Sequence, residues 1–158
     1  MTTLSLIVDN SAGVLTRVSG LISRRGFNID SLAVGKTQDD SLSRITIVVS
    51  CDEATVTQMV DQISKLYCVK EISVLEKGQA KSRELVLVKV KTDASNRNEI
   101  IQICNFFEAT IVEATASSIM IEFTGDMEKE AAFMSLIEQH EIIELARTGV
   151  IALQKTIY

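Results

Sequence analysis

Apolar segments follow one another along this chain in a set order of strand, helix, strand, strand, helix and strand, and the order then repeats. Short runs rich in Ile and Val alternate with stretches whose apolar residues recur at helical spacing, over 158 residues in all. Two such units in succession predict an α+β chain with two ferredoxin-like βαββαβ sandwiches in tandem, each an antiparallel sheet with its helices on one face. Because only 4% of the residues are aromatic, the cores must consist mainly of Ile, Val and Leu.

The first unit is predicted over residues 1–76. We expect strands at 4–8, 28–34, 44–49 and 69–75, with helices beginning near residues 14 and 53. Gly26 suits a left-handed position at the end of the first helix. The second helix has two candidate N-caps, a Ser50–Glu53 capping box and Asp52.

A polar segment at 77–82 is the best candidate for a linker, and the second unit is predicted over residues 83–158. Its expected strands lie at 85–90, 110–114, 119–123, 142–147 and 150–153, and its helices at 100–107 and 127–139. Gly149 is expected to bulge or break the last strand. A four-stranded sheet of this size has exposed edges, so pairing with a second copy, a homodimer, is the physical expectation.

Composition argues against several classes of protein. The net charge of −5 and scattered basic residues disfavour a nucleic-acid binder, and the first and third strands lack the aromatic residues on which RNA-recognition domains stack bases. The lone His140 makes a zinc site improbable on numbers alone, and we expect no metal site. Three unpaired cysteines and the lack of a signal peptide or membrane span predict a cytoplasmic protein with no membrane association.

The turn between the first strand and helix, Asp9–Leu15, carries the strongest functional signal. Gly13 directly before an apolar helix leaves backbone N–H groups unobstructed, and the helix N-terminus adds partial positive charge. A carboxylate or phosphate suits such a position. The alternative, which composition alone favours, is that Asn10 and Gly13 merely form a tight capping turn. The glycine spacing matches neither a P-loop nor a dinucleotide fingerprint.

Asp9-x-x-x-Gly13-Val14-Leu15 after a strand resembles the effector turn of ACT domains, a family of small-molecule sensors. The segments 17–32 (RVSGLISRRGFNIDSL) and 42–49 (LSRITIVV) resemble the small regulatory subunit of acetolactate synthase. Segments 83–89 and 144–149 also fit the second domain of that family. One departure is Ala12, where many ACT turns carry proline, and it is expected to leave the turn more flexible.

The resemblance implies a regulatory chain that is not an enzyme by itself. Its partner would be the large catalytic subunit of acetolactate synthase, which would hold thiamine diphosphate, Mg and FAD, with no cofactor on this chain. The small subunit would raise the activity of that enzyme and make it sensitive to valine in branched-chain amino acid biosynthesis. The implied valine site lies between two ACT domains of a homodimer and comprises Asn10, Ser11, Ala12, Gly13, Val14, Leu15, Asn28 and Ile29.

Other functions remain open from the residues. An ACT-type sensor serving a different biosynthetic enzyme would share the turn. Only the longer signature at 17–32 argues against this alternative. An acylphosphatase-like hydrolase on the same fold would need a basic residue in the turn, where this chain has Asp9. Arg17, Arg24 and Arg25 on the first helix are interpreted either as contacts for the large subunit or as an ordinary solvated face.

Overall fold

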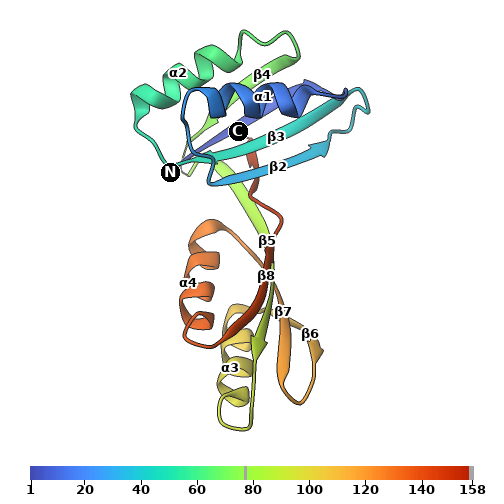
Figure 1. The fold of residues 1–158 in the computed structure, drawn as a ribbon, viewed down its shortest axis with the longest axis vertical. Coiled ribbons are helices and arrows are strands. Elements are labelled where there is room, and N and C mark those ends of the chain that lie inside the picture. Colours follow the sequence, from blue (N-terminus) through green and yellow to red (C-terminus); the bar gives the residue numbers. More distant parts are fainter. Residues whose placement is uncertain (77, 157–158) are drawn as a thin grey trace. The chain divides into compact units, whose positions relative to one another are not determined.

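The computed structural model describes residues 1–76 and 78–156 (Figure 1). These residues form two compact units, which are described separately. The first comprises residues 1–81 together with 150–156, and the second is Ser82–Gly149. The predicted α+β class with two antiparallel sheets is confirmed.

The first unit has the predicted βαββαβ order. Its elements are β1 (Thr2–Asp9), α1 (Val14–Arg24), β2 (Ser31–Lys36), β3 (Leu42–Val49), α2 (Glu53–Ile63) and β4 (Val69–Leu75). The four strands form an antiparallel sheet in the order β2-β3-β1-β4. Both helices cover the same face of this sheet (Figure 1). The two edge strands are therefore β2 and β4.

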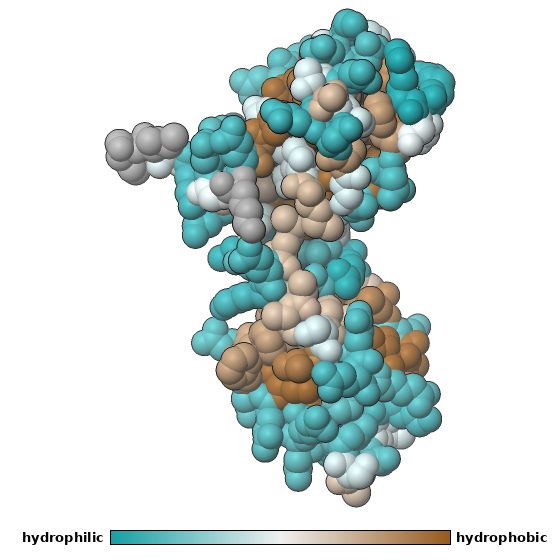
Figure 2. All heavy atoms as spheres, turned by 90° about the vertical axis from the view of Figure 1, so that its left-hand side faces the viewer, coloured by the Kyte–Doolittle hydropathy of each residue, from teal (hydrophilic) through white to brown (hydrophobic). Residues whose placement is uncertain are grey.

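The core of the first unit lies between the sheet and its helices. Alternate residues of β1 and β3, such as Leu4, Leu6 and Ile47, are fully buried against apolar residues of α1 and α2. The same alternation follows from the strand period of two, because neighbouring side chains point to opposite faces. Polar side chains dominate the visible surface, with a few brown apolar patches between them (Figure 2).

The ends of the first unit's helices follow local chemistry. Gly26 adopts a left-handed conformation with φ 72° directly after α1, as predicted. Asp52 caps α2, because its carboxylate accepts a hydrogen bond from Thr55 N at 2.8 Å. This bond lowers the pKa of Asp52. Of the two candidate caps, Asp52 is thus the residue used, and the Ser50–Glu53 capping box is not formed.

The second unit repeats the order around its own sheet. Its elements are β5 (Ala80–Lys91), α3 (Arg97–Phe107), β6 (Thr110–Ala114), β7 (Ser118–Gly125), α4 (Met127–Ile137) and β8 (Ile142–Arg147). The strands lie in the order β6-β7-β5-β8. The linker predicted at 77–82 overlaps β5, which already begins at Ala80. Residue 77 of that segment lies outside the described residues.

The core of the second unit contains three of the chain's five phenylalanines, Phe107, Phe123 and Phe133. The ring of Phe133 stacks on that of Phe123 at 4.6 Å between centroids, and Phe107 meets both rings edge-on. Ile and Val from β5 and β7 complete this core. The two units therefore have separate hydrophobic cores, each of which covers one sheet face.

A partly buried charge cluster ties α4 to the second sheet. The guanidinium of Arg147 on β8 lies 2.7 Å from a carboxylate oxygen of Glu130 and 4.0 Å from one of Glu84. Both carboxylates are buried. Burial raises the pKa of Glu130, an effect that the charge of Arg147 opposes. Because breaking such a pair leaves a buried charge alone, this cluster is structural.

The last strand, β9 (Ile151–Gln154), belongs to the first unit rather than the second. It pairs with β5 and contacts β1 and β4. Gly149, with φ 81°, breaks the extended backbone between β8 and β9, as predicted. As a compact unit, the second one ends at Gly149, because the residues after this glycine pack on the first unit. Residues 157 and 158 lie outside the described residues.

Candidate functional site

The turn between β1 and α1 presents its backbone to solvent. Asn10, Ser11, Ala12 and Gly13 are all exposed, whereas Val14 is buried in the core. Gly13 is the N-cap of α1 and has a left-handed backbone with φ 84°. A Cβ built on this glycine would meet no atom within 4 Å. The space in front of the helix is therefore open to a ligand.

The N–H groups at the start of α1 are largely unused. Val14 N reaches Ser11 O only at 3.4 Å, and the first full helical bond runs from Arg17 N to Gly13 O at 3.0 Å. No acceptor among residues 1–76 and 78–156 takes up the N–H groups of Leu15 and Thr16. Helix N-termini leave such donors free and carry partial positive charge. A carboxylate placed here would accept several hydrogen bonds.

The hairpin between β2 and β3 holds the turn on one side. Asn10 N donates to Ser41 O at 2.7 Å, and Asn10 Nδ2 donates to Asp40 O at 2.8 Å. The hairpin is itself ordered by Asp39, whose carboxylate accepts from Ser41 Oγ at 2.6 Å and from Ser41 N at 2.9 Å. These bonds lower the pKa of Asp39. Asn10 thus does not cap α1, and its Oδ1 remains available to accept a hydrogen bond.

The corner between α2 and β4 holds the turn on the other side. Asp9 N donates to Cys68 O at 2.9 Å, and Asp9 pairs with Lys70 at 3.0 Å. One turn into α1, Arg17 donates to the hydroxyl of Tyr67 and lies 4.8 Å from the centre of its ring. Arg17 is therefore engaged within its own unit, which favours a structural role for this arginine.

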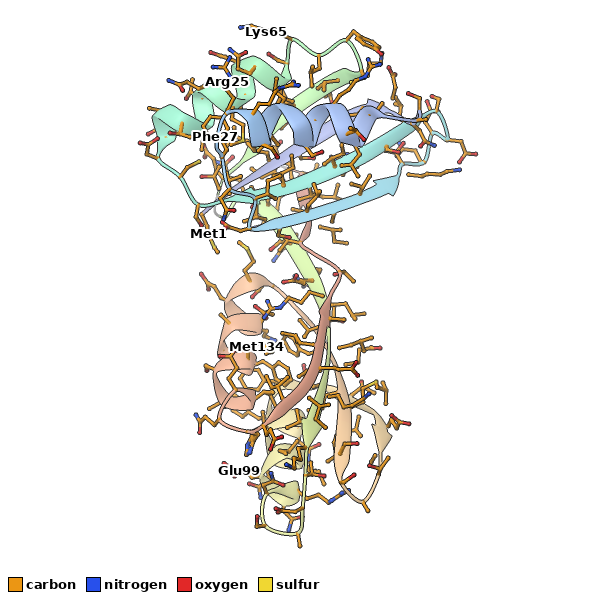
Figure 3. All side chains as sticks on the ribbon, in the orientation of Figure 1. Met1, Arg25, Phe27, Lys65, Glu99 and Met134 are labelled. Atoms are coloured by element: carbon orange, nitrogen blue, oxygen red, sulfur yellow. The ribbon has the colours of Figure 1, made fainter. Side chains whose placement is uncertain are left out.

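Asn28 and Ile29 do not meet the turn within one chain. They lie beyond the C-terminal end of α1, directly after Phe27, which Figure 3 labels. The eleven residues of α1 separate them from Gly13 by about 16 Å. The sequence pattern predicts Asn28 at the start of β2, but that strand begins at Ser31. The exposed Asn28 contacts Asp30 at 3.4 Å, while Ile29 packs partly against the core.

Sequence reasoning missed the residues that position the turn, namely Asp40, Ser41, Tyr67 and Lys70. Asp39, Asp40 and Ser41 are ordinary turn residues. Their proximity to Asn10 follows only from the pairing of β1 with β3, in which Asp9 lies opposite Leu42.

No group of three or more His, Cys, Asp or Glu residues in the described part of the chain is placed to hold a metal ion. Nor is any helix there long and apolar enough to cross a membrane.

The fold and the turn are those of the ACT class of domains, and residues 4–71 match the family described as "AHAS small subunit-like ACT domain". Residues 83–156 match a second family, "Small subunit of acetolactate synthase". The chain belongs to the acetolactate synthase small subunits. The resemblance noted from the sequence is thereby confirmed.

Relatives and a solved structure agree with this assignment over almost the whole chain. The acetolactate synthase small subunit of Mycolicibacterium smegmatis is 44% identical over 97% of this chain and 90% of its own length. A probable acetolactate synthase small subunit of Archaeoglobus fulgidus is 45% identical over 96% and 94%. The crystal structure of the small subunit from Thermotoga maritima superposes with a TM-score of 0.89 at 34% identity, covering 99% of this chain and 98% of that one.

Proposed function

We propose that this chain binds the catalytic subunit of acetolactate synthase, raises its activity and makes it sensitive to valine. The small subunit itself would be a regulatory, non-catalytic chain of branched-chain amino acid biosynthesis in the cytoplasm. Thiamine diphosphate, Mg and FAD would belong to the catalytic subunit. The observation that carries the valine site is the open N-terminus of α1, with free N–H groups and a left-handed Gly13.

The chemistry of the turn suits a free amino acid. The carboxylate of valine would accept hydrogen bonds from the N–H groups that begin α1. Asn10 Oδ1 would accept from the ammonium group, because Nδ2 of the same side chain already donates to Asp40 O. The side chain of Leu15 is 42% exposed beside the turn. Apolar contact with Leu15 would favour a short branched side chain.

A second copy of the chain would complete this site. The edge strand β2 is open to pairing, and Val34 in its middle is exposed. In a side-by-side dimer of ACT domains, Asn28 of one protomer would reach the turn of its partner. Such a dimer has two sites, and each draws residues from both protomers.

Reconstitution tests the proposal directly. Purified chain is added to the catalytic subunit, and acetolactate formation from pyruvate is measured with and without valine. We expect higher activity than with the catalytic subunit alone, and inhibition by valine only when the chain is present. An unchanged rate, or inhibition that needs no small subunit, contradicts the proposal.

Asn28→Ala is expected to weaken valine binding. Asn28 is exposed, and its side chain donates a hydrogen bond to nearby Asp30 at the surface, so its loss should not disturb the fold. One hydrogen bond to a charged ligand group contributes about 1.5–3 kcal/mol, which corresponds to a roughly 10- to 150-fold higher Kd. Calorimetric titration with valine measures this change. The matched control is Asn98→Ala, an exposed asparagine in the second unit, and equal affinities of the two variants would remove Asn28 from the site.

A further inference from the structure

The C-terminal strand β9 covers part of the first sheet on the face that lacks helices. Val150 and Ala152 are buried there, whereas the alternate residues Ile151 and Leu153 are each 60% exposed. β9 contacts both β1 and β4. Several side chains on this face are buried although they are outside the core beneath the helices, namely Thr3, Ser5, Thr46 and Val48. Residues 150–156, here called the C-terminal strap, are therefore a packed layer of the first unit.

One hydroxyl joins the strap to the strand that follows the proposed effector residues. Val150 N donates to Ser31 Oγ at 2.8 Å in a partly buried position. Ser31 is the first residue of β2 and lies opposite Val48. It follows Asn28 by three residues and Ile29 by two. A displacement of this segment would therefore act on Ser31, and through the hydrogen bond on Val150.

The other end of the strap and the chain before it are also held. Lys155 N donates to Gln79 O at 2.7 Å, which fixes the strap beside the start of β5. On the other side of Val150, Thr148 N donates to Leu85 O at 3.1 Å within the second unit. Only Gly149 separates Thr148 from Val150, so a shift of Val150 reaches the second unit over one residue of chain.

We propose that the C-terminal strap transmits valine occupancy from the first unit to the second, with Ser31 as the positioning residue that links it to the effector segment. This inference rests on the proposed function, because it presupposes that valine binds near Asn28 and Ile29. It assigns to residues 150–156 a role in signalling rather than in binding. A change at Ser31 should therefore weaken inhibition by valine without changing the affinity for valine.

Ser31→Ala is the test variant. In the complex with the catalytic subunit, we expect lower maximal inhibition at saturating valine, corresponding to a coupling about fivefold weaker. Calorimetry on the isolated small subunit should give the valine affinity of the unchanged protein. Ser31→Thr keeps the hydroxyl and is expected to retain full inhibition. Loss of inhibition in the alanine variant and its retention in the threonine variant together support the strap.

Hydrogen–deuterium exchange of the peptide that contains residues 150–154 provides a second measurement. Valine is expected to change the exchange of this peptide in the unchanged protein and in Ser31→Thr, but not in Ser31→Ala. Full inhibition of the complex with Ser31→Ala overturns the inference. So does peptide exchange in the unchanged protein that does not respond to valine. Neither result touches the proposed function, which fails only if the unchanged protein does not bind valine or does not confer inhibition.

Discussion

Gly13→Asp is expected to abolish most of the valine sensitivity of the reconstituted enzyme while the chain still binds the catalytic subunit. The new carboxylate would lie at the N-terminus of α1, where the acid group of valine is proposed to bind. Two unit charges 4 Å apart repel by about 4 kcal/mol at an effective dielectric constant of 20. Solvent at this exposed turn reduces that energy, so we expect a loss of about 2 kcal/mol, or roughly 30-fold in valine affinity.

Gly13→Asn is the matched control for this change. Asn and Asp have the same shape, and both tolerate the left-handed backbone that φ 84° requires better than other side chains do. A side chain here also has room, because nothing lies within 4 Å of the added Cβ. The two variants therefore differ in charge alone. Equal inhibition curves for Gly13→Asp and Gly13→Asn would mean that no anion binds at this turn.

Phe133→Ala is expected to destabilise the second unit by about 3–5 kcal/mol, the usual cost of removing a buried aromatic side chain. Phe133 is fully buried, and its ring contacts those of Phe107 and Phe123. Urea unfolding followed by circular dichroism measures the loss. Because the two cores are separate, amide exchange in β1 and β3 should change much less than exchange in β5 and β7.

Phe106→Ala provides the control, since it removes the same side chain from the same unit. Phe106 is 79% exposed, and its ring meets that of Phe107 edge-on at 5.0 Å between centroids. Substitutions at exposed positions usually change stability by less than about 0.5 kcal/mol. A similar loss for both variants would indicate that the stacked rings of Phe123 and Phe133 do not stabilise the core.

The sequence was sufficient for the order of the elements and for the turn at Asp9–Leu15 that leads into α1. Strands β4, β6 and β8 have the predicted bounds, because their apolar runs are flanked by polar or turn residues that end them sharply. Strand β2 begins three residues later than predicted. Its apolar pattern extends back through Ile29, which packs on the core without joining the ladder. Periodicity records burial, and burial does not require strand pairing.

By itself, then, the sequence determined the order of strands and helices, the repeated unit and the glycine-capped helix start, because each depends on residues close together in the chain. The tertiary structure decided which distant segments meet. Strand pairing brought Asp40 and Ser41 to Asn10, and the return of the chain after Gly149 brought Val150 to Ser31. These contacts span 30 to 119 residues. They depend on the register of the sheet and the packing of β9 on its open face, and no local pattern of apolar and polar residues encodes either one.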